Sequence, residues 1–381
     1  MEFKEYELGE LLPYEQPSAY IVETTDYNDS YKTPVLTAGK SFILGYTNET
    51  EGIFDKLPVI IFDDFTTATQ YVNFKFKVKS SAMKILNINT ELVLPKYVFF
   101  RMQTIQLDHS THKRYWIQQY SKLKVAIPSL PEQERIVTHI EELFSELDNA
   151  VETLQTTKQQ LAVYRQAVLK EAFEGDYPEV QLKEISTTIS GYAFKSKKYT
   201  PDGEYIVVKI GNVKERHFDF SRDLTRTNEV DGNILDKYLL RHGDCLITLT
   251  GSRGKRDYGY VTMIDKESNY LLNQRVAALR FDETKALPEY FQYYLSSPDY
   301  RNKFFSYETG NVGQGNVGIK ALWEPMVLLP SIEEQKKIVT EIESRLSVCE
   351  SIEQTVDTAL AQADAMRQSI LKQAFEGGFN Q

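Results

Sequence analysis

The sequence predicts an α+β protein in which two β-rich globular domains are separated by two long helices. We expect these helices to form an antiparallel coiled coil within the chain, with pseudo-two-fold symmetry. Residues 128–175 align without a gap on residues 330–377, and 21 of the 48 pairs are identical. Apolar residues in both copies follow the alternating four-three spacing of a coiled-coil helix. The segments before each copy contain short β-branched and aromatic runs typical of strands.

A chain of 381 residues is too long for one ordinary core, so more than one domain is expected. The expected segments are a globular domain over 1–128, a helix over 129–176, a second globular domain over 177–330 and a second helix over 331–381. With no apolar run of membrane-spanning length and no apolar leader, we expect a cytoplasmic protein. Cys245 and Cys349 are too few for a disulfide framework or a zinc site.

Each repeat copy begins with an S-x-x-E capping box, formed by Ser129 with Glu132 and by Ser331 with Glu334. The four-three spacing includes Tyr164 in the first copy. At the equivalent place in the second copy it includes Met366. Two matched helices favour pairing within the chain, although an isolated stalk or a homodimeric coiled coil stays open. The spacing alone does not set the direction, but equivalent domains before each helix favour an antiparallel pair.

The two globular segments resemble each other less strongly. YELGEL (6–11) is similar to VQLKEI (180–185), and LPKYVFF (94–100) is similar to LPEYFQYYL (287–295). Runs such as CLITL (245–249) are bordered by Gly, Asn or Asp and predict strands. A β-rich α+β domain therefore precedes each helix.

The net charge of −10 at first argues against a nucleic-acid partner, because duplex binding relies on Lys and Arg. The excess is confined to two segments. Residues 132–176 hold 10 acidic and 4 basic residues, and residues 333–381 hold 9 and 5. The remainder carries 35 residues of each sign, so its globular segments are compatible with nucleic acid. The acidic helices are expected to be solvated or to face a protein.

Catalytic signatures are missing from the sequence. It has no P-loop, no G-x-S-x-G, no H-E-x-x-H and no N-P-P-Y or D-P-P-Y of amino-methyltransferases. His109 and His112 have helical spacing for a metal pair, but a third ligand is missing and a polar surface loop is favoured. Asp63 and Asp64 follow an apolar run and are expected to cap a turn. The chain is thus predicted to be a binding protein without a catalytic, cofactor or metal site.

Basic loops with amide and aromatic residues lie at equivalent places of both globular segments, and Arg, Asn and Gln are the residues that pair with base edges in the major groove. In the second segment a Gly-rich basic turn, residues 251–260, follows a predicted strand and can approach a groove closely. The DNA-contact candidates there are Arg253, Lys255, Arg256, Asn273, Gln274, Arg275, Gln314 and Asn316. In the first segment they are Lys40, Thr66, Thr67, Lys113, Arg114 and Trp116. For each residue a solvated charge or an ordinary turn residue is the alternative.

The doubled P-S-[LI]-x-E-Q-x-x-I-V, with each copy opening a helix that ends in A-F-E-G, resembles the specificity subunits of type I restriction-modification systems. SGYAF (190–194), GDCLITLTGSRG (243–254) and NQRVAALR (273–280) are similar to their target-recognition domains. The resemblance covers essentially the whole chain and requires both order and spacing.

The resemblance implies a non-catalytic subunit whose two target-recognition domains each read one half of a split double-stranded DNA site. The helices of that family set the spacing and bind two methyltransferase subunits, which use S-adenosylmethionine. Restriction subunits that use ATP and Mg then join. The candidates for the coiled coil and partner docking are Gln133, Ile136, Ile140, Leu143, Leu147, Leu154, Leu161, Phe173, Gln335, Ile338, Ile342, Ile352, Val356, Ile370 and Phe375.

The first globular segment departs from the family's pattern, because it has FDDFTTA where the second has the basic LTGSRGK. Its recognition domain is therefore expected to belong to a different subfamily. The rival interpretation is a coiled-coil scaffold with two protein- or glycan-binding domains, which a DNA-binding experiment separates from the first.

Overall fold

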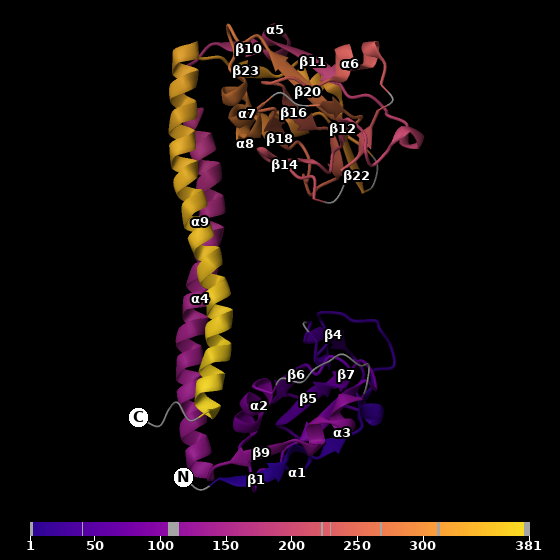
Figure 1. Cartoon of the computed structure of the whole chain (residues 1–381), viewed down its shortest axis with the longest axis vertical. Helices are drawn as coiled ribbons and strands as arrows, with labels where there is room; N and C mark the ends of the chain where they lie inside the picture. The colour runs from indigo at the N-terminus through magenta and orange to yellow at the C-terminus, as the bar shows by residue number, and fades with distance from the viewer. Residues whose placement is uncertain are drawn as a thin grey trace. The chain divides into compact units, whose positions relative to one another are not determined.

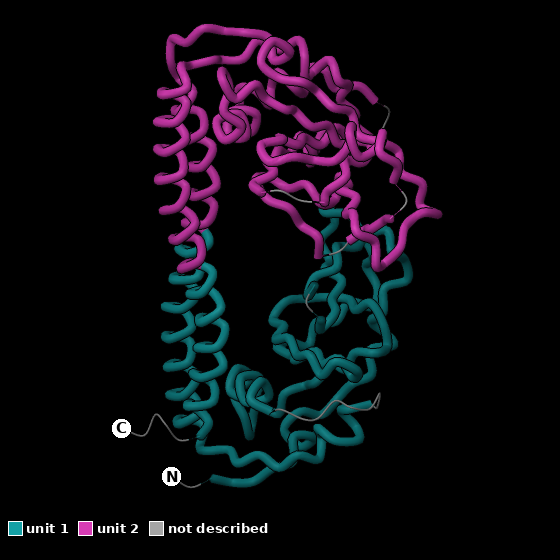
Figure 2. The backbone as a smooth tube through the Cα atoms, turned by 45° about the horizontal axis from the view of Figure 1, so that its top comes forward, with its two compact units in different colours: residues 1–155, 357–381 teal, residues 156–356 magenta. Residues whose placement is uncertain are grey.

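The computed structural model describes residues 3–39, 41–105, 114–221, 224–228, 230–266, 269–310 and 313–376. The chain divides into two compact units, which Figure 2 colours separately. Unit 1 comprises residues 1–155 and 357–381, and unit 2 comprises residues 156–356. The two predicted long helices are present as α4, Leu130–Ala172, and α9, Ile332–Phe375 (Figure 1). Each unit contains a part of both helices (Figure 2).

The globular domain of unit 1 contains a four-stranded antiparallel sheet of order β2-β8-β5-β6 and a three-stranded sheet of order β4-β3-β7. In the second sheet β3 runs antiparallel to β4 and parallel to β7. Strand β1 pairs with β9, which joins the two ends of the domain. The strands are β1 (Lys4–Glu7), β2 (Tyr14–Glu15), β3 (Thr33–Leu36), β4 (Ile43–Thr47), β5 (Val59–Asp63), β6 (Thr69–Val72), β7 (Lys77–Val78), β8 (Met83–Asn87) and β9 (Lys124–Ile127); the helices are α1 (Leu8–Leu11), α2 (Pro95–Gln103) and α3 (Tyr115–Gln118).

The globular domain of unit 2 repeats this plan with sheets of order β11-β20-β16-β18 and β15-β12-β19, and β12 is again antiparallel to one neighbour and parallel to the other. Strand β10 pairs with β23 as β1 does with β9. The strands are β10 (Glu179–Gln181), β11 (Ser186–Ser190), β12 (Tyr205–Val208), β13 (Val213–Lys214), β14 (His217–Phe218), β15 (Arg226–Thr227), β16 (Cys245–Thr248), β17 (Thr250–Ser252), β18 (Val261–Met263), β19 (Tyr270–Leu272), β20 (Val276–Phe281), β21 (Glu308–Thr309), β22 (Gln314–Val317) and β23 (Met326–Leu328); the helices are α5 (Leu182–Ile185), α6 (Gly232–Tyr238), α7 (Pro288–Ser296) and α8 (Pro298–Phe305).

The shared sheet orders show that the domain is duplicated, as the short resemblances between the two segments predicted. Unit 2 adds a three-stranded ribbon of order β17-β22-β21 and the helix α8 directly after α7. In their described parts the two domains therefore share a common core of two sheets. They differ mainly in the ribbon and the helix that unit 2 adds.

The long helices run antiparallel within each unit. In unit 1 Asp148 on α4 forms an ion pair with Arg367 on α9, and residues nearer the start of α4 pack with residues nearer the end of α9. In unit 2 Arg165 pairs with Glu353 at 2.6 Å, and Glu171 pairs with Arg345 at 2.9 Å. Partner numbers on α9 fall as those on α4 rise, so the predicted antiparallel pairing within the chain is confirmed.

The predicted helix seam is wrong at single positions only. Ile352 and Met366 are 40% and 54% exposed, whereas Tyr164, which is 42% exposed, still contacts the other helix, because its hydroxyl accepts from Arg345 Nε at 3.2 Å. Beside Ile352 and Met366 the contact position lies one residue later, at the half-buried Glu353 and Arg367. Charged residues at such positions disguise the true four-three spacing in the sequence. The other apolar seam candidates are buried or half-buried: Ile136, Ile140, Leu143, Leu147, Leu154, Leu161, Ile338, Ile342, Val356 and Ile370.

The predicted capping boxes form only in part. Ser331 Oγ accepts a hydrogen bond from Glu334 N at 3.3 Å, which satisfies one amide of the first turn of α9. The Glu132 carboxylate instead pairs with Arg135 at 2.6 Å, which lowers the pKa of Glu132. Helix capping alone therefore does not explain why the two repeat copies are nearly identical at their ends.

Gln133 and Gln335 join each helix to the domain that precedes it. Both side chains are fully buried. Gln133 Oε1 accepts from Leu94 N at 2.8 Å, and its Nε2 donates to the carbonyls of Leu92 and Pro128 at 3.2 and 2.9 Å. Both N–H donors and the oxygen of the buried Gln133 side chain bind within the chain, so this side chain is not free to dock a partner. The prediction of partner docking is thus corrected for Gln133.

Gln335 repeats the same three hydrogen bonds in unit 2. Its Oε1 accepts from Leu287 N at 2.8 Å, and its Nε2 donates to the carbonyls of Lys285 and Pro330 at 2.9 and 2.8 Å. The same correction applies to Gln335. The identity of E-Q in both repeat copies therefore has a structural cause.

Phe173 and Phe375 of the two A-F-E-G sequences also pack inside the chain. The Phe173 ring meets Tyr290 and Tyr294 edge-on at 5.4 and 5.1 Å between centroids. The Phe375 ring meets Tyr97 in the same way at 5.3 Å. Each globular domain is held by the start of one long helix and by the end of the other, so intramolecular packing accounts for the near-identical ends of the repeat.

None of the helices in the described part of the chain is long and apolar enough to cross a membrane.

Candidate nucleic-acid interface

The ribbon β17-β22-β21 of unit 2 carries two of the predicted DNA contacts on one side. Its register places Ser252 opposite Gln314 and Thr250 opposite Asn316. Because side chains alternate along a strand, Gln314 and Asn316 are exposed while the residues between and after them are buried. The exposed face of β22 thus presents two amide side chains, and amides pair with adenine edges.

The buried face of the ribbon rests on Tyr258. A Cβ added at Gly251 would lie 2.7 Å from Tyr258 Cδ1, and one at Gly315 would lie 2.6 Å from Tyr258 Oη, so both positions require glycine. Tyr258 Oη donates to Glu308 Oε1 at 2.5 Å, and burial together with this carboxylate raises the pKa of Tyr258. The ribbon therefore has a fixed platform beneath it.

The basic turn beside the ribbon is ordered by internal contacts. Asp257 accepts from Ser252 N at 2.6 Å and from Ser252 Oγ at 2.8 Å, and these hydrogen bonds lower its pKa. Arg253 Nη1 donates to Gly310 O at 2.6 Å, and the guanidinium of Arg256 lies 5.0 Å from the Phe305 ring. Lys255 is exposed at the tip. Arg253 and Arg256 hence shape the turn, while Lys255 projects from it.

The segment Asn273–Arg275 lies between β19 and β20. Asn273 is only 8% exposed, so its side chain cannot reach a base edge, and the prediction of direct contact is corrected for this residue. Gln274 and Arg275 are exposed. Arg275 has φ +71°, in the region that favours glycine. Its carbonyl accepts from Leu249 N at 2.9 Å, which fixes this turn to the strand segment beside the ribbon.

In unit 1 the β5–β6 turn and the start of α3 come together. Tyr115 N donates to Asp64 O at 3.2 Å, which brings the exposed Arg114 beside the turn. Asp63 Oδ1 accepts from Phe65 N and Thr66 N at 2.8 and 2.9 Å, so the predicted turn cap is confirmed for Asp63.

Asp64 and Trp116 are core residues of unit 1. Asp64 Oδ2 lies 3.6 Å from Lys84 Nζ, and both side chains are at most 4% exposed. Asp64 Oδ1 accepts from Trp116 N at 2.8 Å, and the Trp116 side chain is fully buried against Phe62. The prediction that Trp116 contacts DNA is therefore wrong, because its ring has no exposed surface. Phe65, which the sequence interpretation missed, is instead 54% exposed on the turn.

The exposed Thr66 remains a candidate on that turn, whereas the Thr67 hydroxyl interacts with Tyr120 and Thr67 has φ +60°. Lys40, Lys113 and the His109–His112 pair lie outside the described residues. Within the ranges that the structure describes, no group of three or more His, Cys, Asp and Glu side chains could hold a metal ion.

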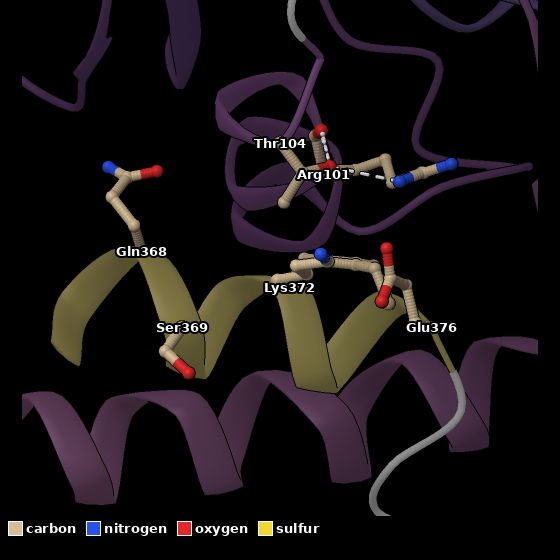
Figure 3. A pocket seen from close by; sticks show the side chains of 7 residues that line it. Arg101, Thr104, Gln368, Ser369, Lys372 and Glu376 are labelled. Carbon is tan, nitrogen blue, oxygen red and sulfur yellow. Dashed lines mark hydrogen bonds between the residues drawn. The ribbon is translucent and has the colours of Figure 1, made fainter. Parts of the chain in front are cut away.

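A polar hollow of about 480 Å³ lies in unit 1 between α2 and the end of α9 (Figure 3). Arg101 Nη1 donates to Thr104 Oγ1 at 2.9 Å, and its guanidinium lies 5.5 Å from the Phe375 ring. Gln368, Ser369, Lys372 and Glu376 of α9 complete the lining. The hollow lies where the globular domain of unit 1 contacts the end of α9, so we interpret it as a feature of that packing contact.

The chain matches the family model described as "Type I restriction modification DNA specificity domain" over residues 1–162 and 174–361. It is 43% identical over 196 residues to the specificity subunit of the type I restriction enzymes EcoR124I/EcoR124II of Escherichia coli, with 48% of each chain covered. It is 28% identical over 275 residues to the EcoKI specificity subunit of Escherichia coli K12, covering 68% of this chain and 58% of that one. These alignments span about half of the length of the curated relatives.

Two solved structures share the fold. One, from work titled "Structural basis underlying complex assembly and conformational transition of the type I R-M system", is 18% identical with a TM-score of 0.72 over 98% of this chain and 97% of that chain. The HsdS subunit of Thermoanaerobacter tengcongensis, also 18% identical, gives a TM-score of 0.55 with the same coverage. Both confirm the predicted fold class. Because the family model covers both globular domains and most of both long helices, the chain belongs to the family of the type I restriction-modification DNA specificity domain.

Proposed function

We propose that the chain is the specificity subunit of a type I restriction-modification complex and reads a bipartite, asymmetric double-stranded DNA site, one half per globular domain. One observation carries the proposal: the two domains share their core sheet orders but expose different loops. Unit 2 presents a ribbon with a basic turn, and unit 1 presents the compact β5–β6 turn. A duplicated scaffold with different exposed loops suits two different half-sites.

Strands β17 and β22 of the unit 2 ribbon suit the major groove, which admits a pair of β-strands. Gln314 and Asn316 face the same side of β22, and the exposed Gln274, Arg275 and Lys255 lie on neighbouring turns. The globular segments carry no net positive charge, so partner subunits would supply much of the phosphate contact.

Methyltransferase subunits are the partners that the long helices suit. Exposed apolar side chains line these helices outside the intramolecular seam: Val163, Val348, Ile352 and Met366. Exposed apolar groups on otherwise acidic helices support docking of a protein. Catalysis would then lie in the partners, with S-adenosylmethionine in the methyltransferase subunits and ATP and Mg in the restriction subunits, in the cytoplasm.

The deciding experiment is an electrophoretic shift with the full chain, with and without its methyltransferase partner, followed by sequencing of methylated adenines in DNA. We expect a shift that depends on sequence and a methylated site with two separated halves. A chain that dimerises and binds protein or glycan but gives no sequence-dependent shift with the partner would support the scaffold interpretation instead.

The helix pair is proposed to set the spacing between the half-sites. Inserting one heptad into both helices, near Thr157 and Ala359, adds about 10 Å at 1.5 Å per residue. Methylation mapping should then show a spacer longer by about 3 base pairs. A heptad inserted into only one helix is the control and should abolish activity, because it breaks the antiparallel register. An unchanged spacer in the double insertion would disprove the proposed spacing role.

Gln314→Ala should relax the sequence preference of one half-site only. Loss of one amide–base pair removes about 1–3 kcal/mol of discrimination. Thr66→Ala, on the unit 1 turn, is the matched variant and should affect the other half-site. Methylation of DNA libraries randomised in each half measures both effects. Equal losses in both halves would show that Gln314 does not contact a base.

A further inference from the structure

The basic turn of unit 2 needs support from outside its own backbone. We call residues 253–260, between β17 and β18, the recognition loop. Gly254, Arg256 and Gly259 have φ values of +80°, +50° and +70°. Glycine adopts such values freely, but arginine does so only when its surroundings impose the conformation. Something must therefore hold the loop at Arg256.

Arg301 on α8 provides this support. Its Nη1 donates to Gly259 O at 2.8 Å, and its Nη2 donates to the carbonyls of Arg256 and Tyr258 at 3.2 Å each. One planar guanidinium thus binds three carbonyls within four residues of the loop. The fixed fork of arginine suits this geometry, whereas the single ammonium of lysine does not.

Aromatic rings fix the Arg301 guanidinium in its place. It lies 5.2 Å from the Phe305 ring and 6.0 Å from the Tyr260 ring. Phe305 also lies 5.0 Å from the Arg256 guanidinium, whose Nη1 donates to Asn302 Oδ1 at 3.3 Å. Residues 301, 302 and 305 of α8 therefore bind the loop from one helix surface.

Arg301 keeps its positive charge in these half-buried surroundings. Burial lowers the pKa of Arg301, and the nearby Glu215 carboxylate opposes that shift. Arginine stays protonated in proteins despite such a shift. The Arg301 guanidinium is half-buried, and its N–H groups donate to carbonyls of the recognition loop within unit 2.

We propose that Arg301 is a positioning residue for sequence reading by unit 2: it contacts no DNA itself and holds the recognition loop in the conformation that places Lys255 and the adjoining ribbon against the bases. This inference rests on the proposed function. In the described part of unit 1 the β5–β6 turn is held by Asp63 instead, so the effect of Arg301 should be confined to one half-site.

The test compares Arg301→Ala and Arg301→Lys with the unchanged chain, each assembled with methyltransferase subunits, on DNA randomised in one half-site at a time. Both variants should lose about 10-fold in discrimination at the unit 2 half-site, the effect of one misplaced base contact. Lysine should not restore it, because charge without the fork leaves the carbonyls unpaired. The unit 1 half-site should keep its full preference.

The salt dependence of binding separates positioning from direct contact. A residue that neutralises a phosphate lowers the slope of log K against log salt concentration by about one when removed. For Arg301→Ala we expect an unchanged slope. Lys303→Ala is the matched control on α8, since Lys303 binds Asp299 and Met326 O and not the loop. It should keep the full discrimination.

Three results would overturn the proposal: a reduced salt slope, an equal loss at both half-sites, or full discrimination in both Arg301 variants. Thermal unfolding of each variant is measured alongside, and unfolding of unit 2 in both would assign Arg301 a purely structural role. If the unchanged chain showed no sequence preference, the proposed function would fail, which is distinct from failure at Arg301 alone.

Discussion

Asp64→Ala should lower the free energy of unfolding of unit 1 by about 3–5 kcal/mol, because it leaves a buried ammonium without its counter-ion. Lys84 Nζ lies 3.6 Å from Asp64 Oδ2, and the two side chains are 4% and 3% exposed. Asp64 Oδ1 also accepts from Trp116 N, so the substitution removes a second buried partner. Urea unfolding followed by circular dichroism measures the effect.

Two further variants make this test specific to a buried charge. Replacing both partners, as Asp64→Leu with Lys84→Met, should recover the part of the stability that the unpaired charge costs, while Trp116 N stays without its acceptor. Asp55→Ala removes an exposed carboxylate 3.7 Å from Lys75 in the same unit and should change nothing measurable. If Asp64→Ala behaved like Asp55→Ala, the pair would not be buried as described.

The repeat and the sequence patterns beside it predicted most of the fold. Sequence identity between the two copies and the apolar spacing predicted both long helices, and their antiparallel pairing within the chain is confirmed. Local signals of this kind survive because helix periodicity depends on residues close in sequence. The sheet orders needed the structure, because pairings such as β3 with β7 join strands more than 40 positions apart.

The seam phase failed for a physical reason. Ile352 and Met366 are apolar at four-three spacing, yet they are exposed beside the contact. Arg165 and Arg367 are half-buried at the contact itself, paired with Glu353 and Asp148. Long charged side chains cover apolar surface with their stems, so hydrophobicity alone mislocated these contacts.

The sequence predicted the outline of the candidate site but not the residues that hold it in place. The basic Gly-rich turn and the amides of β22 were visible because exposed turn residues have recognisable composition. Trp116 was misassigned because its ring packs against Phe62 and other core residues distant in sequence. Arg301 gave no signal at all, since its three carbonyl partners lie more than 40 positions before it.

Gln335→Ala should destabilise unit 2 by about 2–4 kcal/mol, the cost of leaving several buried backbone groups without partners. The fully buried side chain makes three hydrogen bonds, to Leu287 N and to the carbonyls of Lys285 and Pro330. Gln335→Glu should be no better, because a carboxylate has no donor for the two carbonyls. Gln159→Ala, an exposed position on α4 in the same unit, is the control. Thermal unfolding should separate the two glutamines clearly.

The same substitution should also change how strictly the spacing between half-sites is measured. Gln335 fixes the start of α9 to the first turn of α7, so its loss loosens the domain on its helix. Methylation of a library with varied spacers should then show a broader spacer preference while base preference within each half-site is kept. Gln133→Ala should act in the same way through unit 1, since it binds Leu94 N at the start of α2. A spacer preference as narrow as that of Gln159→Ala would mean that the helix seam alone sets the spacing.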